Sequence, residues 1–90
     1  MGRKVAVLVR DRQQEALRVA LGLTLCDNAV QVCLIERRVA PAPGATDFLP
    51  VLRELGVPLA TTCGGDAGFE LLSPAELARR LLGCDHVLTY

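Results

Sequence analysis

A cysteine in front of a glycine pair is the feature of this sequence that most directly suggests chemistry. Cys63 follows a short apolar run, residues 57–62, and precedes Gly64 and Gly65. The run predicts a buried strand, and parallel α/β sheets bind ligands beyond the carboxyl ends of their strands. Glycines there let backbone N–H groups approach the sulfur, and a helix beginning after them would favour thiolate over thiol. The pattern indicates a nucleophilic cysteine; the alternative is a structural cysteine in a glycine turn.

Strand and helix patterns alternate along the chain in a way that would place Cys63 at such an edge. Apolar runs predict strands at residues 4–9, 30–35, 57–62 and 86–89, with a short extended piece at 70–72. Helices are predicted between them at 13–25, 47–55 and 74–82. We therefore expect residues 1–90 to form a single α/β domain, a small flavodoxin-like three-layer fold with a parallel sheet of four to five strands.

Local signals fix several ends of these elements. Ser73, Pro74 and Glu76 match a capping box with proline at the first helical position. Gly56 predicts the end of the second helix, in which Pro50 is tolerated only in the first turn. Prolines make residues 36–46 a loop. The first helix carries more apolar positions than one stripe needs, so we expect it to be buried on more than one side.

Other segments that follow strands should share the edge with Cys63. Arg10, Asp11 and Arg12 come after the first strand, and residues 36–38 after the second. Arg10 or Arg12 could lower the pKa of the Cys63 thiol, or face solvent or an acidic partner. Asp66 fits a turn or cap better than a catalytic acid, and Tyr90, which closes the last strand, fits packing better than catalysis.

The remaining cysteines and the single histidine are weaker candidates for a functional role. Cys26, Cys33 and Cys84 are expected to be small buried hydrophobic residues. His86 begins its strand, which puts it at the opposite end of the sheet and disfavours a cysteine–histidine dyad. Without a Cys-x-x-Cys pair, and with one histidine, a structural zinc site has little support, so no metal is predicted. The first strand–helix turn lacks the Gly, Ser or Thr cradle of a phosphate site, which disfavours a nucleotide- or flavin-binding module and leaves no cofactor predicted.

Composition limits the partners and the setting. Ten basic and ten acidic residues balance to zero, and aromatic residues make up 3%, which argues against direct nucleic-acid binding. Hydrophobic residues make up 51% and the mean hydropathy is +0.35, an excess that predicts a subunit interface. The apolar run near the start is too short for a signal peptide or a membrane span. These features favour a cytoplasmic protein with reduced thiols and no membrane association.

The order of the elements and several stretches resemble a known family. A strand, a helix with Glu-Ala-Leu-Arg-Val-Ala-Leu at residues 15–21 and a second strand come first, followed by residues 55–64 with Gly68 beyond them, and by residues 72–78 continuing through 84–90. Together they resemble the DsrE/DsrF-like family of sulfur-relay proteins of the TusBCD type. The resemblance covers nearly the whole chain, and the placed Cys63 is its sharpest part. The short second helix, the loop with Pro41 and Pro43, and the overall length depart from longer members.

The resemblance implies a sulfurtransferase-type carrier that accepts sulfane sulfur as a persulfide on Cys63 and passes it on. It implies sulfur-donor and sulfur-acceptor proteins as partners, and a trimer, a hexamer or a mixed-subunit assembly. By carry-over only Cys63 is catalytic, while Gly64, Gly65, Arg10 and Arg12 are candidates for activating the thiol or binding substrate. The alternative is a non-catalytic subunit of such an assembly, since some small subunits of this family lack the active cysteine.

Overall fold

The computed structural model describes residues 2–35, 48–63 and 68–90. They form five strands and three helices in the order β1 (Lys4–Val9), α1 (Gln13–Leu25), β2 (Ala29–Leu34), α2 (Leu49–Glu54), β3 (Leu59–Thr61), β4 (Glu70–Leu71), α3 (Pro74–Leu82) and β5 (His86–Thr89).

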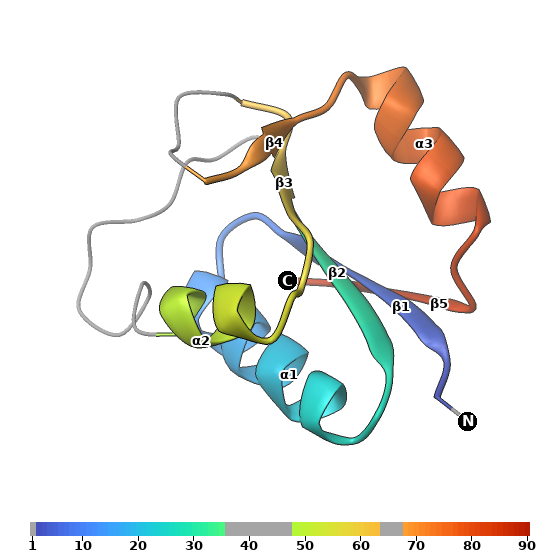
Figure 1. Ribbon diagram of the computed structural model, residues 1–90. Helices are drawn as coiled ribbons and strands as arrows, with labels where there is room; N and C mark the ends of the chain where they lie inside the picture. Colours follow the sequence, from blue (N-terminus) through green and yellow to red (C-terminus); the bar gives the residue numbers. More distant parts are fainter. Residues whose placement is uncertain (1, 36–47, 64–67) are drawn as a thin grey trace.

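The strands form one all-parallel sheet in the order β4-β3-β2-β1-β5 (Figure 1). β1 is an inner strand next to the edge strand β5: it pairs with β2 from Lys4↔Ala29 to Val9↔Leu34, and on its other side with β5 from Val5↔His86 to Leu8↔Thr89. The predicted α/β fold with a parallel sheet is therefore confirmed.

The helices cover the two faces of the sheet unequally. α1 and α2 lie together on one face and α3 lies on the other, as Figure 1 shows. The reason is the path of the chain: the connections from β1 to β2 and from β2 to β3 move one way across the sheet, while the connection from β4 to β5 moves back. Right-handed crossovers running in opposite directions must lie on opposite faces. The result is a doubly wound, three-layer, flavodoxin-like arrangement.

The core alternates along each inner strand. Val5, Val7 and Val9 face α1 and α2 in the larger buried cluster, and Leu8 belongs to the smaller cluster under α3. This two-residue period across two covered faces is why β1 appears in the sequence as a continuous apolar run. Of the described residues, four are buried in the smaller cluster: Leu8, Cys33, Ala60 and Leu72.

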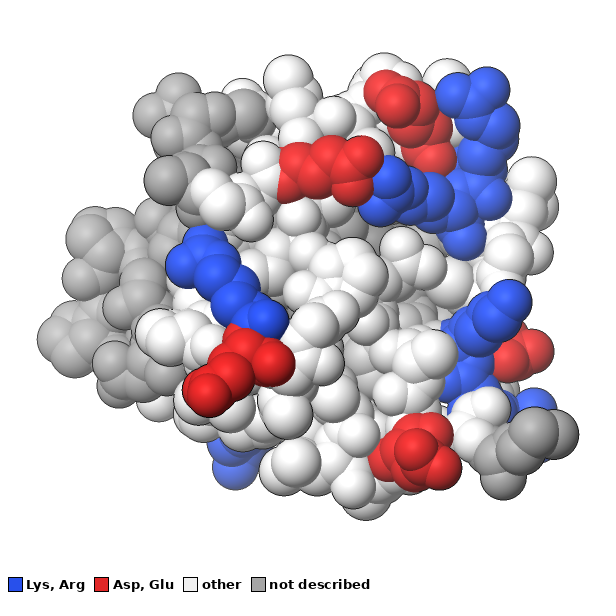
Figure 2. All heavy atoms as spheres, in the orientation of Figure 1, with Lys and Arg blue, Asp and Glu red and all other residues white. Residues whose placement is uncertain are grey.

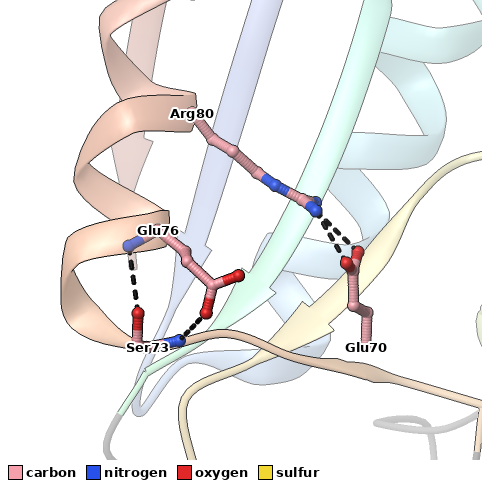
Figure 3. Close-up of polar contacts among 4 residues, drawn as sticks. All are labelled: Glu70, Ser73, Glu76 and Arg80. Atoms are coloured by element: carbon pink, nitrogen blue, oxygen red, sulfur yellow. Dashed lines mark hydrogen bonds and ion pairs between the residues drawn. The ribbon is translucent and has the colours of Figure 1, made fainter.

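α3 begins with the predicted capping box. The backbone N–H of Glu76 donates to the Ser73 hydroxyl at 3.2 Å, and the backbone N–H of Ser73 donates to the Glu76 carboxylate at 3.0 Å (Figure 3). Pro74 takes the first helical position, where no backbone donor is needed. No residue of α3 is buried, so local capping matters more to this helix than to α1.

Several bounds differ from the sequence prediction. β3 is half as long as predicted, because its ladder partners β2 and β4 meet it over only a few residues. β2 begins and ends one residue earlier than predicted. Pro50 lies in the first turn of α2, and Gly56 has the positive φ of 78° that a helix-ending glycine favours. The prediction of a loop at residues 36–46 falls in a part of the chain outside the described residues.

The first helix is buried along one side. Its buried residues are Gln13, Ala16, Leu17 and Ala20, and Leu25 at its end is 69% exposed. The predicted second buried side is not seen in the single chain: Val19, Leu21 and Leu23 are only partly buried. None of the described helices combines the length and the apolar character needed to cross a membrane.

We expect the capping box to stabilise α3 more strongly when Glu76 is ionised than when it is protonated. The hydrogen bond from the Ser73 backbone lowers the pKa of Glu76. A pKa lowered by folding contributes stability above the unfolded value of about 4.3, and that stability is lost as the pH falls through the folded value. Glu76→Gln should therefore lower the free energy of unfolding more at neutral pH than at about pH 2.5.

Denaturant unfolding at the two pH values measures this difference. Glu54→Gln, which alters an exposed carboxylate on α2, is the matched control. An effect of Glu76→Gln that is equal at both pH values would contradict the prediction.

Candidate functional site

The carboxyl ends of the strands form one edge, as the sequence predicted, and backbone hydrogen bonds continue along it beyond the strands. The N–H of Tyr90 donates to Leu8, that of Ile35 to Val9, and that of Thr62 to Leu34, at 2.8 to 3.0 Å. Along this edge the segments therefore follow the strand order β5, β1, β2, β3.

Cys63 lies at the β3 end of this edge and is exposed. Its backbone N–H donates to the Thr61 hydroxyl at 3.1 Å, and Thr61 is buried. The backbone of Cys63 is thus held at the end of the strand, and the residue is exposed at the surface. An exposed thiol on a fixed backbone is accessible to a reactant, which a buried cysteine is not.

The predicted activating groups next to Cys63 are only partly described. Gly64, Gly65 and Asp66 fall in the stretch 64–67, about which the structure gives no account. After that stretch, Gly68 has a φ of 81° and its Cα faces the Arg53 side chain so closely that a Cβ would lie 2.5 Å from the guanidinium. The same guanidinium stacks over Phe69 at 5.6 Å from the ring centroid. Through Arg53, α2 thus contacts the chain at Gly68 and Phe69, just before the chain enters β4.

The two candidate arginines occupy different places. Arg10 follows β1, two strands from the end of β3, and forms an exposed ion pair with Asp11 at 3.8 Å. Arg12 is the N-cap residue of α1 and is also exposed, but its side chain makes no capping hydrogen bond. Both share the carboxyl edge with Cys63, with the end of β2 in between.

A pocket opens on this edge, where the sequence predicted that the segments after the strands meet; the order of those segments around it was not predicted. It has a volume of about 350 Å³ and is lined by Leu8, Arg10, Asp11, Ile35, Thr89 and Tyr90. These residues come from the ends of β1, β2 and β5. Finding the pocket from the sequence would have required knowing that β5 pairs with β1.

A second pocket, of about 470 Å³, lies at the opposite, amino edge of the sheet, where Lys4, Ala29 and Pro58 contribute to its lining. Arg80 reaches it from α3, and its guanidinium binds both carboxylate oxygens of Glu70 at 2.8 Å (Figure 3). Cys63 is at the other edge. This pocket is therefore remote from the candidate nucleophile.

The other cysteines differ in burial. Cys33 is buried as predicted, and burial raises the pKa of its thiol to about 11; Arg80 opposes the rise, while Cys63 adds to it. Cys84 is half-buried: it accepts a hydrogen bond from Gln31 Nε2 at 3.1 Å and donates to the Arg80 carbonyl at 3.5 Å. All four cysteines are free thiols.

The prediction that Cys26 is buried is wrong. Cys26 is exposed, because it caps the end of α1 where the chain turns through Asp27, whose φ is 67°. His86 begins β5, pairs with Val5 and lies at the amino edge, as predicted, away from Cys63. Among the described residues, no group of three or more His, Cys, Asp or Glu side chains could hold a metal ion.

Charge on the surface is mixed. On the face drawn in Figure 2, acidic and basic side chains lie next to one another in small mixed groups, and uncharged surface separates the groups. This agrees with the zero net charge of the sequence, and such a face provides no strong field for a polyanion.

Comparison with protein-family models, with curated proteins and with solved structures finds no significant match to this chain.

We predict that the thiols differ strongly in reactivity in the folded protein. Cys63 and Cys26 are exposed, whereas a pKa of about 11 leaves roughly one Cys33 thiol in a thousand ionised at about pH 8. A pulse of iodoacetamide followed by peptide mass spectrometry should label Cys63 and Cys26 first and Cys33 last. Labelling of Cys33 at the rate of Cys26 under native conditions would contradict the burial of that thiol under α3.

Proposed function

We propose that the protein carries sulfane sulfur as a persulfide on Cys63. The observation that carries the proposal is an exposed thiol fixed by the backbone at the carboxyl edge of a doubly wound parallel sheet. That edge is where proteins of this architecture bind their ligands. The resemblance of residues 55–64 to the DsrE/DsrF-like family supports the same role.

The chemistry needs few groups beyond the sulfur. The Cys63 thiolate attacks the outer sulfur of a donor persulfide, the donor S–S bond breaks, and the donor leaves as a thiolate. An acceptor thiolate then attacks the outer sulfur of the Cys63 persulfide and regenerates the Cys63 thiolate. A thiolate leaving group needs no proton at neutral pH, so the position of His86 at the amino edge is no obstacle.

The partners in this proposal are a sulfur donor and a sulfur acceptor, without nucleic acid or membrane. Four free cysteines fit a reducing compartment, and we place the protein in the cytoplasm.

A non-catalytic subunit of an oligomeric sulfur-relay assembly is the second candidate. The specific observation in its favour is apolar surface left open in the single chain: Leu25 is 69% exposed, Leu82 is 85% exposed, and α3 is the one described helix on its face of the five-stranded sheet. Exposed side chains of this kind become buried when copies or different subunits associate. We therefore propose that the protein forms an oligomer: a trimer, a hexamer or a mixed-subunit assembly. Such an assembly is compatible with Cys63 as a sulfur carrier and with Cys63 as a structural residue.

Loading with sulfur decides between the two roles. Incubation with inorganic polysulfide, followed by intact-mass spectrometry without reductant, should add about 32 Da, one sulfur atom on a reactive thiolate. Cys63→Ser should abolish the addition.

Cys26→Ser is the matched control, because Cys26 is equally a surface thiol but lies at the end of α1. This variant should still gain the sulfur. Sulfur distributed over both exposed cysteines alike, or none on Cys63, would leave the assembly role as the better explanation.

A further inference from the structure

The two edge strands of the sheet differ in how well they are protected against pairing with a further strand. An edge strand exposes unpaired backbone donors and acceptors, and natural proteins protect it by shortness, charge, proline or bulges. β4 has two residues, and its Glu70 forms an ion pair with Arg80 at 2.8 Å. β5 has four residues, His86–Thr89, and contains no Lys, Arg, Asp, Glu or Pro. The edge at β5 therefore lacks the protection that the edge at β4 has (Figure 1).

The backbone of β5 directs donors and acceptors away from β1. The Tyr90 N–H donates to the Leu8 carbonyl, and the Tyr90 carbonyl accepts from the Arg10 N–H, both at 2.9 Å. Because the backbone groups of successive residues in a strand point to opposite sides, those of Thr89 and Val87 point to the other side of β5. β5 is the last strand of the described sheet on that side. These two residues can therefore accept a new strand.

The side chains of β5 are divided between the two faces of the sheet. Leu88 and Tyr90 pack against the larger buried cluster under α1 and α2, and strand alternation places His86 on the same face. Val87 and Thr89 lie on the α3 face. Val87 is 42% exposed, although valine is among the residues that proteins most often bury. Apolar surface thus accompanies the open backbone groups.

A second copy of β5 matches this edge when it runs antiparallel with the two Leu88 residues opposite each other. Val87 of each copy then lies opposite Thr89 of the other, and each such pair can exchange both of its backbone hydrogen bonds. His86 lies opposite Tyr90 on one face. Cross-strand pairs of β-branched or aromatic residues are favourable, and the stretch 86–90 has no Lys, Arg, Asp or Glu that would oppose like charges.

The backbone hydrogen bonds favour this register over its neighbour. Centring the pair on Val87 would place Thr89 opposite Asp85, whose N–H already donates to the Lys4 carbonyl at 2.7 Å. Centring it on Leu88 uses only residues whose backbone groups point outward. The contact is the same patch on both copies, so it closes with two chains and leaves no β5 edge open.

We propose that β5 is a dimerisation edge, on which β5 of a second copy of this chain pairs antiparallel about Leu88 and joins the two sheets into one. The inference does not depend on sulfur chemistry at Cys63. It gives the proposed oligomer a specific contact. A hexamer can contain two-fold contacts of this kind, whereas a trimer has no two-fold axis.

Sedimentation equilibrium of the full chain measures the association. The protein should form assemblies with an even number of copies. Val87→Lys adds to β5 the kind of charge by which natural edge strands avoid pairing, and it should raise the dissociation constant at least about tenfold.

Leu71→Lys is the matched control. Leu71 is an apolar residue of the other edge strand, β4, and is 63% exposed. Its replacement should leave the association unchanged. Thermal unfolding checks that both variants are folded.

Amide hydrogen exchange followed by NMR tests the register. The Thr89 N–H should exchange at least about tenfold more slowly in the wild type than in Val87→Lys at the same concentration, because only the pair of copies gives it an acceptor. The Tyr90 N–H, which is bonded to Leu8 within one chain, should be similarly protected in both. If Val87→Lys does not fold, protection of the Thr89 N–H in the associated wild type decides.

A protein that stays a single chain at every concentration, or that forms a trimer, would overturn the inference. So would an assembly that Val87→Lys leaves intact, or one in which the Thr89 N–H exchanges freely. The proposed function fails separately: if the dimer forms through β5 but polysulfide does not load Cys63, the dimerisation edge stands and the sulfur-carrier role does not.

Discussion

Parallel pairing of β1 with a neighbour on each side is the constraint on which the rest of this structure depends. Each strand that joins the sheet in parallel must bring its carboxyl end to the same edge. Through β2 and β3 this pairing places Cys63 on the edge, and through β5 it places Thr89 beside Arg10. The backbone hydrogen bonds that continue past the strand ends fix the order of these segments.

The unequal helical layers explain why two nearby thiols differ so much. On the α3 face, one helix with no buried residue covers a small cluster of four buried side chains, Cys33 among them. Desolvation there disfavours the Cys33 thiolate. Cys63 lies beyond the end of its strand, and the residue is exposed. The same sheet therefore keeps one sulfur inert and leaves another accessible.

Local signals predicted the elements whose ends are local in origin. β1, α1, α3 and β5 have the bounds expected from apolar runs and from the capping box of Ser73 and Glu76. β3 was predicted too long because the length of a strand depends on its partners, and β4 offers it only two residues. The sequence alone does not contain that limit in any local pattern.

The candidate site was predictable to a similar extent. A cysteine after an apolar run was enough to place Cys63 at a strand end, and the position of His86 at a strand start was enough to separate the two. The prediction that Cys26 is buried was wrong, because burial at the end of a helix depends on which residues pack against that end. The meeting of the strand ends was predicted, but the lining of the pocket was not, because it depends on the strand order: Leu8 and Thr89 are neighbours only because the last strand joins the first.

That junction has a consequence for how the protein folds. The contact between Lys4 and Asp85 joins residues 81 positions apart, and forming it closes a large loop of chain. Such distant contacts are costly in entropy and tend to form late, which slows folding. The pocket between β1 and β5 is therefore assembled only when this closure is complete, whereas β1, α1 and β2, which are adjacent in sequence, can come together before it.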